Sequence, residues 1–258
     1  MKRLGLAFRR HYPQGLSLLA FLLLWQIAVT AFHIKEFILP SPLKVFAYLL
    51  LPDLAPKYHW LKHIGTTLGE MLISFSATAL LGIFVAILMT WSDFLRRVIT
   101  PIIALFNSLP KIALAPLFLL WFGFGIIPNI LIAVLIAFFP VVINTATGLN
   151  AVEEDLLDLV RYLHASKRQV FLKIRLPNSL PYVFSGFKIS TTLCVVGAIV
   201  GEFIASTQGL GYLIKSSQGT MDTPPMFASL ILISFLGLLF FGAISVLERL
   251  VMPWQGSK

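Results

Sequence analysis

Six long apolar stretches dominate this chain and constrain its fold more than any other feature. They cover about 16–33, 65–91, 99–122, 126–148, 180–204 and 227–251. Each is long enough for a transmembrane helix, which needs about 20 mostly apolar residues. Unbroken apolar runs of this length do not fit the alternating strands of a membrane barrel. We therefore expect an all-α membrane protein with six transmembrane helices.

Composition agrees with a membrane protein. Hydrophobic residues make up 58% of the 258-residue chain and charged residues 12%, with a mean hydropathy of +0.89. Soluble domains are about a quarter charged. The net charge of +9 does not indicate nucleic-acid binding, because the basic residues flank apolar stretches and form no long patch. A single cysteine, Cys194, excludes an intrachain disulfide framework and a cysteine metal cluster.

The Lys and Arg residues in the connections predict the orientation. With the N-terminus inside, the cytoplasmic connections hold thirteen of these residues and the outer connections hold five. This predicts a cytoplasmic N-terminal segment (1–15), one membrane domain (16–251) and a cytoplasmic tail (252–258). The first stretch resembles a signal peptide, but no small-residue cleavage pattern follows it. We interpret it as a retained span.

Two outer connections are long enough to hold structure of their own. Prolines divide the segment 33–64, and Leu43–Leu51 between them is predicted to be a short helix on the membrane surface. The segment 206–226 contains three glycines and two prolines. Glycine and proline mark turns, so an irregular outer loop or a re-entrant turn is expected there.

The most charged part of the chain is the predicted cytoplasmic connection 150–178. Acidic residues begin a first short helix at Glu153, where the helix dipole favours negative charge. An apolar stripe follows at helical spacing: Leu156, Leu159, Val160 and Leu163. Ser166 and Gln169 fit a capping box that starts a second helix, and Pro177 is expected to end it. Composition alone also allows a solvated amphipathic hairpin on the lipid surface.

The spacing within this connection resembles the cytoplasmic loop of ABC-importer permeases. That loop has the form Glu-Ala-Ala, three residues, Gly, nine residues, Ile-x-Leu-Pro. Here Ile174-Arg175-Leu176-Pro177 matches its end, Asp158-Leu159-Val160 stands at the Glu-Ala-Ala position and His164 stands at the Gly. The acid is kept, whereas the alanines and the glycine are replaced by bulkier residues. The groove that receives this loop would therefore have to be wider.

Further segments from about residue 65 to 251 are similar to the nitrate, sulfonate, taurine and pyrimidine-precursor permeases. They include Asn107–Leu117, Trp121–Gly125, Leu180–Lys188, Gly197–Phe203 and Gly209–Tyr212. The resemblance implies a permease in a bacterial cytoplasmic membrane that forms a dimer, homodimeric by expectation. It implies two ATPase subunits and an extracytoplasmic binding protein as partners. The implied solute is small and polar or anionic: a thiamine-pyrimidine precursor, riboflavin, a sulfonate such as taurine, or nitrate.

The same resemblance assigns an ATPase-docking role, as coupling helices between the fourth and fifth spans, to one set of residues. They are Asp158, Leu159, Val160, Leu163, His164, Ala165, Ser166, Ile174, Leu176 and Pro177. ATP chemistry is expected on the partner, because this chain has no G-x-x-x-x-G-K-[ST] phosphate loop. ATP and Mg²⁺ are therefore assigned to the ATPase, and we expect no cofactor, metal or catalytic residue on this chain. A secondary transporter and an intramembrane enzyme are the alternatives.

Polar residues within the spans are candidates for the substrate pathway. Among them, the ionisable side chains cost about 2.5–3.5 kcal/mol each in the membrane and therefore favour a functional interpretation. The candidates are Asn107, Ser108, Lys111, Asn144 and Glu202. The nearby prolines Pro110 and Pro116 allow either an ordinary kink or a broken helix that lines the pathway. The alternative for Lys111 and Glu202 is structural, as a buried pair or as hydrogen bonds that lock two spans.

Three outer residues have less specific interpretations. His59 and His63 are four residues apart and could bind a metal on one helix face. No third ligand lies nearby in the sequence, so a solvated pair is the preferred interpretation. Glu70 is interpreted as a pathway candidate or an ordinary residue of the outer membrane interface.

Overall fold

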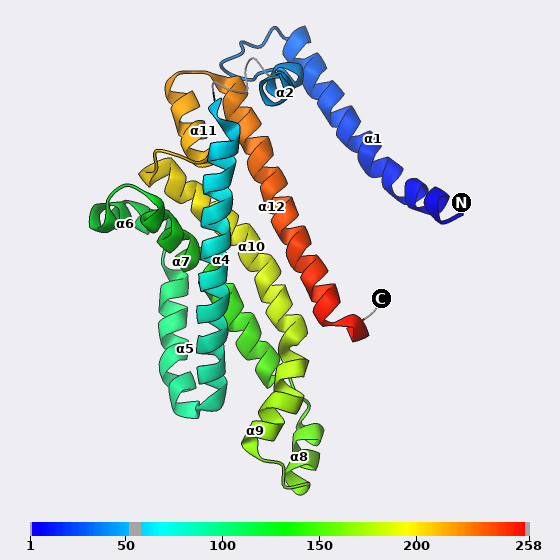
Figure 1. Ribbon diagram of the computed structural model, residues 1–258, viewed down its shortest axis with the longest axis vertical. Helices are drawn as coiled ribbons and strands as arrows, with labels where there is room; N and C mark the ends of the chain where they lie inside the picture. The colour runs from blue at the N-terminus through cyan, green and yellow to red at the C-terminus, as the bar shows by residue number, and fades with distance from the viewer. Residues whose placement is uncertain (1, 52–57, 256–258) are drawn as a thin grey trace.

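The computed structural model describes residues 2–51 and 58–255, and it describes side chains from Gly15 onward within these ranges. Every regular element in the described residues is helical (Figure 1). The elements are α1 (Lys2–Ala31), α2 (Pro42–Leu50), α4 (Trp60–Trp91), α5 (Asp93–Ser108), η1 (Lys111–Leu114), α6 (Ala115–Phe122), α7 (Ile126–Asn150), α8 (Glu154–Tyr162), α9 (Lys167–Val170), the π-helical turn η2 (Phe171–Arg175), α10 (Leu176–Ala205), α11 (Leu210–Gly219), α12 (Thr223–Val251) and η3 (Pro253–Gln255).

Four helices are long and apolar enough to cross a membrane: α4, α7, the continuous helix Lys167–Ala205 and α12. A fifth span is possible if α5 and the segment Lys111–Phe122 count together, although they bend by 83°. The apolar helix Gly15–Ala31 is shorter than these. The all-helical membrane fold is thus confirmed, while the count of six spans stays a prediction.

The core of the bundle is the packing of α10 along α7, with α4 packed on α7 and also in contact with α10. Gly197 and Gly201 lie four residues apart on α10 and face α7. A Cβ atom at Gly197 would stand 2.3 Å from Cα of Ala133, and one at Gly201 would stand 2.6 Å from Cα of Asn129. Small residues at this spacing let two membrane helices approach closely. The glycines therefore set the α7–α10 distance.

The predicted span 99–122 is broken into two helices. Leu109 has an extended backbone (φ −70°, ψ 141°) and precedes Pro110, after which η1 and α6 begin. Proline disfavours the helical conformation in the residue before it and removes a backbone donor. α5 packs along α4, whereas α6 packs on α7 and α10. The helix is therefore broken rather than kinked, while the lining of a pathway by this break stays a prediction.

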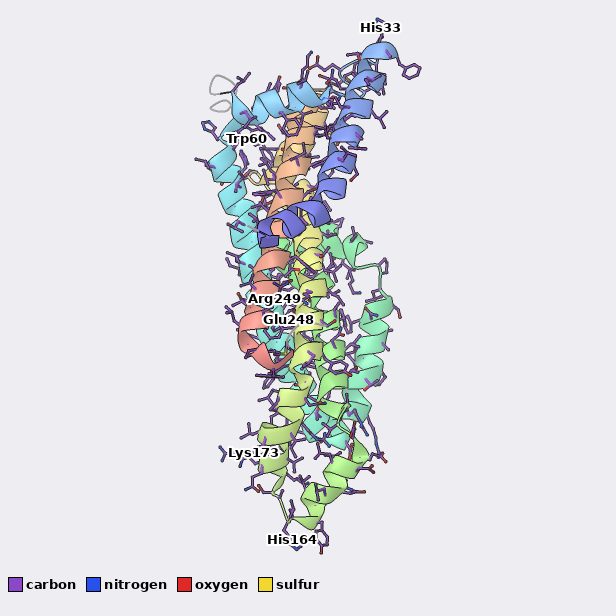
Figure 2. The ribbon with its side chains drawn as sticks, turned by 90° about the vertical axis from the view of Figure 1, so that its right-hand side faces the viewer. His33, Trp60, His164, Lys173, Glu248 and Arg249 are labelled. Carbon is purple, nitrogen blue, oxygen red and sulfur yellow. The ribbon has the colours of Figure 1, made fainter. Side chains whose placement is uncertain are left out.

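The connections between the long helices lie at two opposite ends of the molecule. α8, α9 and the α4–α5 turn lie at one end, and α2 and α11 lie at the other (Figure 1). Figure 2 shows His164 at the first end and His33 and Trp60 at the opposite end. This agrees with the alternation of connections expected from the sequence. The absolute orientation, the cytoplasmic placement of both termini and the three-part division of the chain stay predictions.

The two predicted outer connections have different outcomes. The short helix expected at Leu43–Leu51 is confirmed as α2, while its place on the membrane surface stays a prediction. Residues 52–57 of that connection lie outside the described residues. The segment 206–226 is more ordered than expected, since it contains α11. Two of its glycines mark the ends of this helix: Gly209, with φ 105°, is the N-cap residue, and Gly219 is the last helical residue. Met1 and residues 256–258 of the predicted tail are also outside the described residues.

Candidate functional site

The first helix of the charged connection, α8, ends in a left-handed turn at His164. Glu154 and Asp155 occupy its first turn, as the sequence predicts. At its end the amide of Ala165 donates to the carbonyl of Val160 (3.0 Å) and that of His164 to the carbonyl of Arg161 (2.9 Å). This is the Schellman arrangement, which usually places glycine at the left-handed residue. His164 has φ 55°, and it stands at the position that is glycine in the ABC-permease pattern.

The second helix begins as predicted but does not end as predicted. The capping box is present: the amide of Gln169 donates to Oγ of Ser166, and the amide of Ser166 donates to Oε1 of Gln169. Pro177 was expected to stop this helix. Instead the chain passes through the wider π-helical turn η2 into α10, with Pro177 in the first turn of α10, where a missing amide proton is tolerated. One continuous helix, Lys167–Ala205, results.

The apolar stripe of α8 faces outward and has no partner within the described chain that buries it. Leu159 is 55% exposed, Leu163 is 66% exposed and Tyr162 is 83% exposed. Asp158 and Arg161 pair on the same helix at 2.8 Å. An exposed apolar stripe edged by charges is typical of a surface that a partner protein covers.

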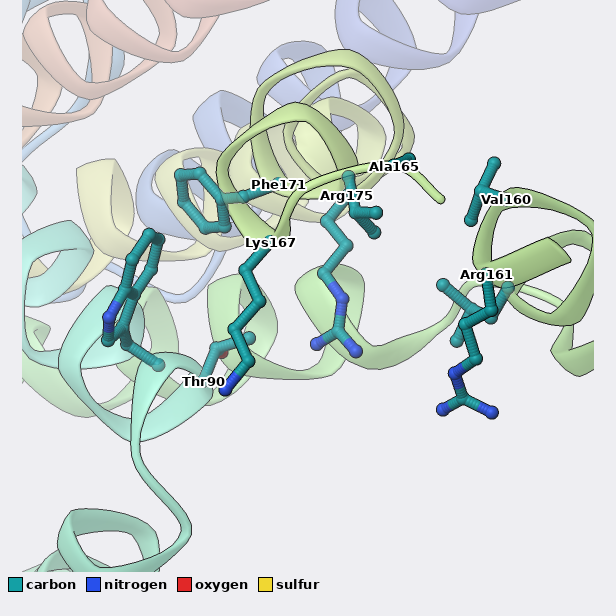
Figure 3. Close-up of a pocket in the computed structure, with 10 residues that line it drawn as sticks. Thr90, Val160, Arg161, Ala165, Lys167, Phe171 and Arg175 are labelled. Carbon is teal, nitrogen blue, oxygen red and sulfur yellow. The ribbon is translucent and has the colours of Figure 1, made fainter. Parts of the chain in front are cut away.

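A cavity of about 370 Å³ lies behind this hairpin, against the end of α4. Its walls include Trp91, Phe171 and three basic residues, Arg161, Lys167 and Arg175. Figure 3 shows the charged ends of these three side chains pointing away from the helices that carry them. Trp91 and Phe171 pack edge to face, with ring centroids 5.4 Å apart. This contact links the hairpin to the first long span.

The predicted docking residues divide between the two parts of the hairpin. Those on α8 and its turn are mostly exposed: Asp158, Leu159, Leu163, His164 and Ser166, with Val160 and Ala165 half-buried. Those of the Ile-x-Leu-Pro end lie on η2 and the start of α10, where Ile174 and Leu176 are half-buried and Pro177 is exposed. The hairpin tip is therefore the accessible part of the set.

The predicted pathway residues gather in part at the break between α5 and η1. The ammonium of Lys111 donates to Oδ1 of Asn107 (2.9 Å) and lies over the Phe139 ring, 4.7 Å from its centroid. Ser108 is exposed beside them and donates to its own helix. Asn144 lies on α7 and donates to the carbonyl of Pro140. Glu202 is not part of this group.

Glu202 lies in a separate hydrogen-bonded network at the end of the bundle that carries α11, which is the predicted outer end. Its Oε1 accepts from the hydroxyl of Thr67 (2.5 Å) and its Oε2 accepts from the amide of Gly211 (2.6 Å). The Thr67 hydroxyl in turn accepts from the amide of Leu210 (2.9 Å). The side chain of Glu202 is fully buried. This geometry supports the structural alternative, although its partners are α4 and α11 and not Lys111.

Three further residues complete this network, and the sequence interpretation missed their role. Glu70 is fully buried, not an interface residue, and accepts from Nδ2 of Asn129 (2.8 Å). His63 is 8% exposed and its Nδ1 accepts from the amide of Gly209 (2.9 Å), so the solvated His59–His63 pair is wrong for His63. The described residues contain no group of three or more potential metal ligands. A signal was present: His63, Thr67, Glu70, Ser74 and Thr78 recur at helical spacing.

Comparison with known proteins identifies the chain. Residues 78–253 match the family described as "Binding-protein-dependent transport system inner membrane component". The chain belongs to this family. The permease is 33% identical over 240 residues to the formylaminopyrimidine transport permease of Halalkalibacterium halodurans, covering 93% of this chain and 94% of that one. It is 32% identical to the riboflavin transport permease of Chloroflexus aurantiacus (93% and 89%) and 29% identical to the taurine transport permease of Escherichia coli (93% and 88%).

Solved structures of similar fold agree with this assignment. The inward-facing MetNI methionine ABC transporter has a chain that superposes with a TM-score of 0.64 at 20% identity, covering 73% of the permease and 94% of that chain. At this identity the match supports the fold alone. With the family match, it shows that the permease is a multi-pass ABC-importer permease and not an enzyme.

Proposed function

We propose that the permease is the transmembrane subunit of an ATP-driven importer of a bacterial cytoplasmic membrane. Two copies pair with each other, bind two ATPase subunits that hold ATP and Mg²⁺, and receive solute from an extracytoplasmic binding protein. The observation that carries this proposal is the α8–α9 hairpin. It presents an exposed apolar stripe at one end of the molecule, and its left-handed turn at His164 coincides with the glycine of the ABC-permease loop.

The continuity of the helix after the hairpin suggests how a docked ATPase moves the membrane domain. Since Lys167–Ala205 is one helix, a displacement of α9 is passed along α10. α10 packs closely on α7 through Gly197 and Gly201, so α7 is expected to move with it. Tightly packed interiors transmit such shifts and do not absorb them. Alternating access then follows from the rocking of α7 and α10 against the helices of the second copy.

The favoured solute class is a nitrogen heterocycle such as an aminopyrimidine or riboflavin. Support comes from the two relatives at 33% and 32% identity, whose names state these solutes. Lys111 favours the second candidate, a small anion of the sulfonate or nitrate class. Its ammonium has only neutral partners, Asn107 and the Phe139 ring, among the described residues. In this proposal Asn107, Ser108, Lys111 and Asn144 line the pathway, and Glu202 positions the outer helices.

Reconstituted vesicles with the permease, its ATPase and its binding protein test the proposal. ATP inside the vesicles should drive uptake of a labelled aminopyrimidine or riboflavin, and taurine or nitrate should not compete. Uptake of the anions alone would select the second candidate. Uptake without ATP would contradict the importer and support a secondary transporter. Lys111→Met lowers uptake if the side chain lines the pathway, whereas Lys215→Met, an exposed lysine of α11, serves as the matched control.

A further inference from the structure

Two carboxyl groups meet inside the membrane-spanning part of the permease. Glu70 on α4 and Glu202 on α10 are both fully buried and share their surroundings. Glu202 accepts from Thr67, one turn before Glu70 on α4. Glu70 accepts from Asn129 of α7, which packs against Gly201 beside Glu202. Two ionised carboxylates have no proton to donate to each other. Any hydrogen bond between the two groups therefore requires that one of them is protonated.

The neighbours of the pair supply hydrogen bonds but no positive charge. Glu202 accepts at both oxygens, from Thr67 and Gly211. Glu70 accepts at Oε1 from Asn129, and its buried Oε2 has no recorded donor. Without a cation in contact, two adjacent negative charges in a buried site are strongly unfavourable.

Within the described chain, the helices that pack against the pair bring no other charged group into contact with either carboxyl. α7 carries none along its whole length. On α4, His63 accepts a hydrogen bond from the amide of Gly209. On α10, Lys188 lies 14 residues before Glu202 in the sequence and pairs with Glu248 of α12. Cys194 of the same helix is a buried free cysteine. On α11, Lys215 is exposed and Tyr212 stacks on His63. Among the described residues, none of these groups forms a hydrogen bond or an ion pair with either carboxyl.

We propose that Glu70 and Glu202 form a buried proton-binding site in which Glu70 holds one proton at Oε2 and donates it to Glu202. Glu202 is the anion of the pair because it receives two hydrogen bonds from other groups, whereas Glu70 receives one. A metal cation fits the site less well. Within the hydrogen-bonded network of the pair, Glu70 Oε2 and Asn129 Oδ1 are the two buried oxygens without a hydrogen-bond partner among the described residues. Hard cations take about six or more oxygen ligands.

This proton holds the outer helix α11 against the span helices. Gly209 and Gly211 begin α11 directly on Glu202: a Cβ atom at Gly209 would stand 2.2 Å from the carboxyl carbon of Glu202. The same carboxyl is held by Thr67 of α4, which also binds the amide of Leu210. Loss of the proton would place two negative charges in contact and push α4 away from α10 and α11. The outer end is therefore closed while the proton is bound and loosens in alkaline solution.

Infrared spectroscopy of the full permease complex tests the site directly. At neutral pH the wild type should show a protonated carboxylic C=O band. Glu70→Gln should remove it, and Glu36→Gln, a change at an exposed outer carboxyl paired with Lys44, should leave it. The wild-type band should disappear on alkaline titration and be insensitive to Na⁺ and K⁺. A neutral-pH spectrum without such a band, or a band that Na⁺ or K⁺ removes, would overturn the proposal.

Thiol labelling reports the movement of α11 and does not depend on ATPase docking. Ser217 is 5% exposed and the native Cys194 is buried, so a cysteine at 217 is the reporter. Labelling of Ser217→Cys should rise several-fold over the pH range in which the wild-type carboxylic band disappears. Adding Glu70→Gln should abolish this rise, because a glutamine amide keeps donating to Glu202 at every pH. A labelling rate of Ser217→Cys that stays constant over the pH range in which the carboxylic band disappears would contradict the coupling to α11.

Discussion

The two ends of the permease use polar residues in opposite ways. At the outer end, Thr67, Glu70 and Glu202 are fully buried and bonded to other helices of the same chain. At the hairpin end, the apolar residues Leu159 and Leu163 are exposed and Asp158 pairs only within its own helix. Buried polar groups that are satisfied internally stabilise one arrangement. Exposed apolar groups need a partner, so the first end is self-contained and the second is an interface.

This contrast predicts opposite responses to mutation. Changes at the outer end and in the core beside it should reduce stability and leave ATPase binding of the folded fraction intact. Changes that add or reverse charge on the exposed face of the hairpin should reduce ATPase binding and leave stability intact. The comparison would be wrong if a variant of the outer end lost ATPase binding without losing stability, or if a charged variant of the hairpin lost stability.

The largest stability effect is expected for Gly197→Ala. The new Cβ atom would lie 2.3 Å from Cα of Ala133, which is backbone and cannot move aside without separating α7 from α10. Overpacking typically costs about 1–3 kcal/mol, and a backbone clash belongs at the upper end. Thermal denaturation of the detergent-solubilised permease measures the loss. Gly242→Ala, on α12 with nothing within 4 Å of its Cβ position, is the control and should be neutral or slightly stabilising.

A smaller loss is expected for Thr67→Val, which keeps the shape of the side chain. It removes the hydroxyl that donates to Glu202 and accepts from the amide of Leu210. A buried group left without its partner costs about 1–3 kcal/mol. Thr66→Val is the matched control, since Thr66 bonds only to Lys62 of its own helix. Equal denaturation midpoints for the two variants would show that the outer network does not stabilise the permease.

The smallest effect is expected for His164→Gly. A left-handed conformation costs a non-glycine residue roughly 1–2 kcal/mol, and His164 has φ 55°. Glycine should therefore stabilise the α8–α9 turn slightly and keep or improve ATPase binding. Amide hydrogen exchange of the hairpin measures the local change. Faster exchange than in the wild type would mean that the histidine side chain itself supports the turn.

The sequence was sufficient for the elements that depend on local pattern. The long apolar helices, the surface helix α2 and the Ser166 capping box all follow from runs and spacings of a few residues. The predictions from sequence failed where tertiary contacts determine the structure. The π-helical turn absorbs Pro177, and α11 forms on Glu202 where glycines suggested a loop.

The candidate sites show the same division. The hairpin set could be recognised because its residues are close in sequence. The pairing of Glu70 with Glu202 could not, because these residues are far apart in the chain and come together only when α4 and α10 pack against α7. The polar residues from His63 to Thr78 recur at helical spacing and form a buried face of α4, a signal that the sequence interpretation did not use.

Co-purification of the ATPase tests the central claim, that the α8–α9 hairpin is the docking surface. The triple variant Asp158→Lys, Leu163→Asp and His164→Glu reverses or adds charge at exposed hairpin positions. The matched control is Leu50→Asp on α2, an exposed leucine at the opposite end of the molecule (Figure 1). We predict that the triple variant inserts normally, denatures like the wild type and retains almost no ATPase, while the control retains it. Wild-type retention of the ATPase by the triple variant would contradict the account.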